Sequence, residues 1–243
     1  MIKIKDFIEK HSVHLKNYIA ALIMIIGSFA ITVAVFISNK EFGSAFFQFI
    51  KETPLLFLLN YFPVVLFMAL ILFISNNALF ATVSSGGFFL LMAIANSEKV
   101  RLRQDPLFPT DLSLFTELVG IAKNFSPKII LIYLFIIAFI LLIVVFTFIF
   151  FKSEKLSAPI RITGICTIFI IGAVSNNFLY TNVELYNSFA VEGNQYFEVN
   201  QYGSKGFIYS FCHKFNSMKV KAPDGYNSTY YASLENDFKS STS

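Results

Sequence analysis

Residues 129–151 read IILIYLFIIAFILLIVVFTFIFF, an uncharged run that is long enough to cross a lipid bilayer. A helix of about 20 apolar residues spans a hydrocarbon core about 30 Å thick. The rest of the chain agrees, because 56% of its 243 residues are hydrophobic and only 14% are charged. Soluble domains carry about 25% charged residues. The sequence therefore predicts an integral membrane protein.

Four other runs have the same character. Together with 129–151, they predict an all-α membrane protein with five transmembrane helices, at about 18–38, 54–75, 78–96, 129–151 and 162–180. A polar leader, residues 1–17, precedes this domain (18–180), and a polar tail, residues 181–243, follows it. Pro63 removes an amide donor within the second span, so the carbonyl that it frees needs a partner on a neighbouring helix. Ser84-Ser-Gly-Gly87 predicts close helix packing or, alternatively, a substrate groove.

The loop between the third and fourth spans contains the motif RLRQDPLFPTDL, residues 101–112. Pro106 and Pro109 are structural residues that predict an extended backbone. Asp111 (or Thr110) is placed to cap an amphipathic helix over 112–123, which would lie flat in the membrane interface.

Arg101 and Arg103 precede that helix at the height of the lipid headgroups. They are the candidate headgroup-binding residues, since a guanidinium group matches the geometry of phosphate oxygens. The alternative is that both arginines only anchor the loop, by snorkelling or by pairing with Asp105 and Asp111.

Several classes of function are disfavoured by what the sequence contains. The basic residues are scattered among acids, which predicts no nucleic-acid partner. The predicted spans contain no Asp, Glu, Lys, Arg or His, which disfavours a coupled transporter. The three histidines are far apart in sequence, and the two cysteines are predicted to lie at different depths. We therefore expect no catalytic residue, no metal site and no disulfide in this chain.

Three segments, in this order, resemble the membrane half of the lipoteichoic acid synthase family, the phosphoglycerol transferases of the alkaline-phosphatase/sulfatase superfamily. Arg103–Leu112 is similar to the family's Arg-Gly-x-Pro-Leu-x-Pro-Ser-Asp-Leu loop, with Gln104 in place of the usual Gly. Tyr202–Phe211 resembles an Asn-Tyr-x-x-Asn-Gly-Phe-x-x-Phe segment and matches it at Gly206-Phe207. Ala222–Asn227 is close to the Lys-Pro-Glu-Gly-Tyr-Ser that precedes the family's catalytic domain.

The resemblance implies the cell membrane of a Gram-positive bacterium, with a cytoplasmic N-terminus and an exterior loop and tail. The positive-inside rule leaves this orientation open, because basic residues are balanced between the two sides. Family members transfer glycerol phosphate from phosphatidylglycerol, using a threonine nucleophile and a divalent metal, typically manganese. Those groups belong to an extracellular domain that is not in this chain, so no catalytic residue or metal ligand is carried over.

We therefore expect a membrane anchor that positions a catalytic domain, either truncated or one half of a split enzyme with a separately encoded sulfatase-like partner. Membrane lipids, phosphatidylglycerol among them, are the other expected partners, and residues 181–243 would be an exterior linker. The alternative is a stand-alone membrane accessory or lipid-handling protein of the cell envelope. The aromatic segment at Phe207, Ile208, Phe211 and Phe215 would be an interfacial strap or, alternatively, part of the core.

Overall fold

The computed structural model describes residues 2–39, 49–112, 127–150 and 156–215, and all regular structure in these ranges is helical. Five stretches within it are long and apolar enough to cross a membrane: Tyr18–Ser38, Pro54–Ser75, Ala78–Arg103, Ile130–Phe150 and Ala158–Tyr180. The five predicted spans are thus confirmed. The third continues seven residues further than expected, and the fifth begins at Ala158.

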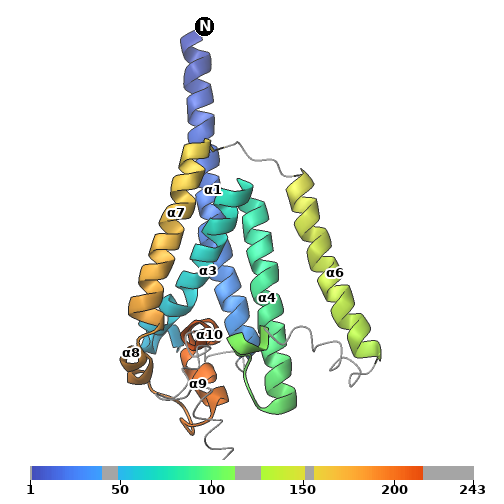
Figure 1. The fold of residues 1–243 in the computed structure, drawn as a ribbon. Coiled ribbons are helices and arrows are strands. Elements are labelled where there is room, and N and C mark those ends of the chain that lie inside the picture. The colour runs from blue at the N-terminus through green and yellow to red at the C-terminus, as the bar shows by residue number, and fades with distance from the viewer. Residues whose placement is uncertain (1, 40–48, 113–126, 151–155, 216–243) are drawn as a thin grey trace, which may run out of the picture.

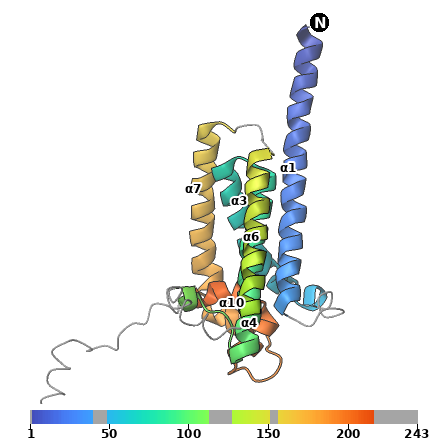
Figure 2. The ribbon, with the colours of Figure 1, turned by 90° about the vertical axis from the view of Figure 1, so that its right-hand side faces the viewer.

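The spans belong to α1 (Ile2–Asn39), α3 (Pro54–Ser75), α4 (Ala78–Arg103), α6 (Pro127–Phe150) and α7 (Ala158–Ser175), which continues into the π-helical turn η2 (Asn176–Tyr180). Successive spans run in opposite directions (Figure 1). The leader is not a separate helix, since α1 is unbroken and its first turns project beyond the other spans (Figure 2).

Three short helices follow the last span: α8 (Val183–Ser188), α9 (Glu198–Lys205) and α10 (Phe207–Lys214). They gather beneath the bundle, at the end opposite the N-terminus (Figure 1). The segment that follows α4, residues 104–112, lies at the same end. We call this the loop end of the bundle.

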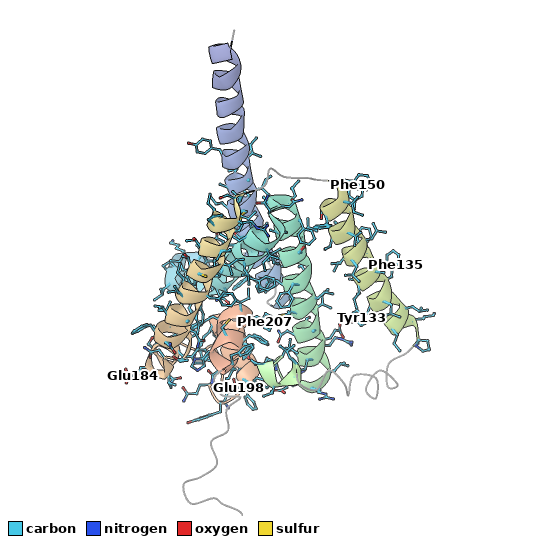
Figure 3. The ribbon with its side chains drawn as sticks, turned by 45° about the horizontal axis from the view of Figure 1, so that its top comes forward. Tyr133, Phe135, Phe150, Glu184, Glu198 and Phe207 are labelled. Atoms are coloured by element: carbon cyan, nitrogen blue, oxygen red, sulfur yellow. The ribbon has the colours of Figure 1, made fainter. Side chains whose placement is uncertain are left out.

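For the aromatic segment, Phe215 is 51% exposed, and the alternative of core packing is confirmed only for the part that lies in α10. Its side chains Phe207, Ile208 and Phe211 are buried, and they pack in one cluster with residues of α3 and α4, among them Val64 and Phe89. Figure 3 shows Phe207 beneath the spans, between α7 and α4. Within the described part of the expected tail, α10 is therefore packed into the bundle. The segment Ala222–Asn227 lies outside the described residues.

Small residues bring the spans close together. A Cβ on Gly86 would lie 3.6 Å from Ile31 of α1, and one on Gly87 would lie 2.6 Å from Ile140 of α6. Ser85, which precedes the two glycines, is fully buried. The interpretation of Ser84–Gly87 as a packing motif is confirmed, since a larger residue at Gly87 would displace α6.

The carbonyl freed by Pro63 has a partner on another helix, as the sequence predicted. Pro63 lies inside α3, so the carbonyl of Leu59, four residues earlier, receives no helical hydrogen bond from it. The hydroxyl of Tyr180, in η2, donates to this carbonyl at 2.9 Å. This bond ties the end of the fifth span to the proline turn of the second.

Candidate functional site

The two candidate arginines lie on the last turn of α4, not in the loop where they were expected, because the helix continues to Arg103. Arg101 is paired with Glu98, one turn earlier: Nη2 and Nε lie 2.5 and 3.0 Å from the same carboxylate oxygen. Tyr133 of α6, labelled in Figure 3, also hydrogen-bonds to Glu98. Arg101 remains 58% exposed despite this pairing. Arg103 is exposed and has no ion pair or hydrogen bond within the described residues.

The acids of the loop pair with Lys99 and not with the arginines. The Nζ atom of Lys99 lies 3.1 Å from the carboxylate of Asp105 and 2.8 Å from that of Asp111, and it donates to the carbonyl of Pro106 at 2.8 Å. It also lies over the ring of Phe108. One ammonium group therefore fastens both ends of the loop, and the expected pairing of the arginines with these acids is wrong.

Asp111 closes a turn of the loop. Its Oδ2 atom accepts from the amide of Phe108 at 2.7 Å, three residues earlier. The helix that Asp111 was expected to cap, at 112–123, begins at the edge of the described residues and otherwise lies outside them, so that prediction stays open. Pro106 and Pro109 are fully buried, and the amide of Leu107 donates to Asn96 of α4 at 2.8 Å. The segment is thus folded back under the bundle.

Gln104 begins this loop with an unusual backbone conformation. Its φ of 55° lies in the left-handed region, where its amide caps α4 by donating to Val100. Side chains with a Cβ are disfavoured there, and glycine is the usual residue at such a helix end.

We expect Gln104→Gly to raise the free energy of unfolding by about 1 kcal/mol, since glycine adopts this conformation without the steric cost. Thermal unfolding in detergent, followed by circular dichroism, measures the change. Gln201→Gly, within α9, is the comparison and is expected to destabilise, because glycine is a poor residue inside a helix and the contact of Gln201 with Lys205 is lost. Destabilisation by Gln104→Gly would contradict the conformation seen here.

The loop contacts α9 and α10 directly. The ring of Phe108 meets that of Tyr202 edge-on, with centroids 5.9 Å apart. Leu107 and Phe108 pack on the buried cluster that contains Phe207 and Phe211. Two segments that are far apart in sequence, 103–112 and 202–211, therefore form one unit at the loop end.

Asn60 of α3 holds the second of these segments in place. Its Oδ1 atom accepts from the amide of Tyr209, in the first turn of α10, and its Nδ2 atom donates to the carbonyl of Lys205. Asn60 thus caps α10 from another helix. Its amide occupies the space where a Cβ of Gly206 would lie, and the φ of Gly206 is +89°. A glycine is required at this position on both counts.

A buried amine lies beside this junction. Lys205 is 1% exposed, and its Nζ atom lies 3.7 Å from the ring centroid of Tyr186 and 3.2 Å from Oε1 of Gln201. Burial lowers the pKa of Lys205 to about 8. His213 is half-buried: it stacks on Tyr186 and donates from Nδ1 to the carbonyl of Tyr180. Burial also lowers the pKa of His213.

The lowered pKa of Lys205 predicts a rise in stability with pH. Between about pH 8 and the ordinary value of 10.5, the unfolded chain holds more protons on this amine than the folded chain does, so the free energy of unfolding increases as pH rises through that window. We expect the thermal midpoint to increase from about pH 7.5 to 9.5. Lys205→Met should remove this increase, whereas Lys128→Met, at an exposed site, should keep it. Equal slopes for the wild type and Lys205→Met would contradict the assignment.

Within the part of the chain that the structure describes, no three His, Cys, Asp or Glu side chains are grouped so that they could hold a metal ion. At the loop end, Arg103 is open to solvent and Arg101 is partly engaged with Glu98, so both guanidinium groups can approach an anion. Lys99, Lys205 and Asn60, which organise this end, were not predicted as site residues.

Comparison of the chain with family models, with curated proteins and with solved structures found no match.

Proposed function

We propose that this chain is the membrane domain of a phosphoglycerol transferase related to the lipoteichoic acid synthases, and that it binds an anionic phospholipid headgroup at Arg103 on the outer side of the cell membrane. One observation carries the proposal. The two described segments that resemble the family, Arg103–Leu112 and Tyr202–Phe211, pack against each other at the loop end. If the two segments serve one function in this family, they are expected to lie in contact with each other in the folded protein.

The backbone supports the same resemblance. Gln104 stands where the family pattern has Gly, and it is one of two non-glycine residues with a positive φ in the described ranges. Gly206 matches a glycine of the second family segment and also has a positive φ. Both pattern positions thus fall where the backbone favours glycine.

The headgroup assignment depends on the arginines themselves. The C-terminal end of a helix repels anions, so α4 contributes no attraction for phosphate through its dipole. Affinity must come from the guanidinium groups, which bind phosphate oxygens in pairs. Arg103 is the principal ligand in this proposal, because Arg101 is already paired with Glu98. Transfer of glycerol phosphate would be performed by a sulfatase-like domain with its own metal, in the same polypeptide or separately encoded.

Lipid binding by the purified chain tests the proposal. In neutral detergent, native mass spectrometry should show that phosphatidylglycerol is retained in preference to phosphatidylcholine, and Arg101→Ala/Arg103→Ala should abolish the preference. Arg161→Ala is the control, since Arg161 lies at the opposite end and donates to the carbonyls of Phe73 and Ile74. Equal retention of both lipids by the wild type would overturn the headgroup assignment. It would favour the alternative, a stand-alone accessory or lipid-handling protein.

A further inference from the structure

A largely apolar groove of about 490 Å³ opens between α3, α7 with η2, and α10. Its walls are formed by apolar side chains of the second and fifth spans, among them Leu70 and Phe169, and Cys212 and Phe215 of the α10 segment line it at the loop end. This size is typical of ligand sites. The groove does not include Arg101 or Arg103, which lie on α4.

Gly172 of α7 lines the groove without serving helix packing. A Cβ on Gly172 would meet none of the described residues within 4 Å, whereas one on Gly27, Gly87 or Gly164 would meet a side chain of a neighbouring span at 2.5–2.6 Å. A glycine within a helix costs about 1 kcal/mol relative to alanine. At the other three positions close packing offsets this cost. At Gly172 the glycine leaves open space toward the groove instead.

The walls of the groove are fixed in place before anything binds. Tyr180 and Pro63 both line it, and the hydrogen bond from Tyr180 to the carbonyl of Leu59 joins the two walls. The wall of α7 ends in the π-helical turn η2, and π-helical turns are frequent at functional sites. The groove is therefore a preformed feature of the bundle.

The depth of the groove matches one leaflet of a bilayer. Its lining runs along α7 and η2 from Ile168 to Tyr180, and the twelve helical steps between these residues span about 18 Å at 1.5 Å per step. This is roughly half of the 30 Å hydrocarbon core. The outer wall faces the bilayer, since Phe169 is 63% exposed within a membrane span. A molecule that binds in the groove would therefore enter it from the hydrocarbon core of the bilayer.

We propose that this groove binds one acyl chain of a phospholipid from the leaflet at the loop end. The chain would lie along α7 with its terminal part near Leu70 and its ester end near Tyr180 and Asn176, whose polar groups line that end. This site is separate from Arg103 and does not depend on the headgroup proposal.

The chain contains no tryptophan, so the fluorescence of a single introduced tryptophan comes only from the position where it is placed. Phe169→Trp places it in the groove, and Ile170→Trp places it on the adjacent residue outside the groove, with exposed fractions of 63% and 64% for the native side chains. Each variant, in detergent, is titrated with phosphatidylcholine that carries brominated acyl chains, which quench tryptophan on contact.

We expect Phe169→Trp to show a saturable quenching step at low lipid, and Ile170→Trp to show only gradual quenching that follows the lipid content of the micelle. Adding Gly172→Phe to Phe169→Trp should fill the groove and remove the saturable step. Coincident curves for the two tryptophan variants would overturn the proposal, because the groove would then meet only bulk lipid. No quenching at Phe169→Trp would also overturn it and would indicate that another protein segment covers the groove.

Discussion

Asn60→Ala is expected to lower the free energy of unfolding by about 3 kcal/mol. The substitution removes the cap of α10 and leaves the buried amide of Tyr209 and the buried carbonyl of Lys205 without their partner. Each unsatisfied buried group costs about 1–3 kcal/mol. Since α10 packs in the core, its loss also exposes the buried faces of α3 and α4.

The change is measured as the thermal midpoint of the loss of helical circular dichroism in detergent. Asn177→Ala is the matched control, because Asn177 is exposed in η2, and its replacement is expected to change stability by less than about 0.5 kcal/mol. A midpoint for Asn60→Ala equal to that of the control would show that Asn60 does not hold α10 against α3.

Arg103→Ala is expected to weaken phosphatidylglycerol binding about tenfold, which corresponds to about 1.4 kcal/mol, and Arg101→Ala should weaken it much less. The difference follows from the ion pair: Arg101 shares its charge with Glu98, whereas Arg103 has no such partner within the described residues. Titration of each variant with phosphatidylglycerol in neutral detergent gives the two dissociation constants. Glu98→Gln provides a further check, since it frees Arg101 and should strengthen binding. A larger loss for Arg101→Ala than for Arg103→Ala would reverse the assignment.

Hydropathy and local chemistry predicted much of the bundle. The five spans follow from uncharged runs of sufficient length, and the need of the Leu59 carbonyl for a partner on another helix follows from the missing amide of Pro63, although the identity of that partner, Tyr180, does not. These inferences hold because each concerns a single helix or a single lost donor. A helix in a bilayer must satisfy such groups wherever they occur.

The residue at which the third span ends could not be predicted from the sequence. We predicted that this helix ends at residue 96. The pairing of Glu98 with Arg101 was therefore not predicted, because it requires that both residues lie on one helix, three residues apart. The same boundary placed Lys99 in a loop. Its contacts with Asp105 and Asp111 depend on a chain reversal at Gln104, which has no glycine to mark it.

The position of α10 also could not be predicted from sequence alone. It has eight residues within a polar stretch, so its apolar face fits an interfacial strap as well as a core helix. Whether α10 lies in the interface or in the core depends on Asn60. This residue lies in another span, far away in the sequence, and accepts a hydrogen bond from the amide of Tyr209. Contacts of this kind appear only when the helices are placed in space.

Photo-cross-linking at the end of α4 tests the headgroup assignment most directly. A benzophenone amino acid at Leu102, which is exposed between the two arginines, leaves both guanidinium groups intact. In membranes of mixed phosphatidylglycerol and phosphatidylcholine, we expect it to capture phosphatidylglycerol preferentially, and Arg103→Ala should abolish that preference. Capture of the two lipids in proportion to their abundance would contradict a headgroup site at Arg103.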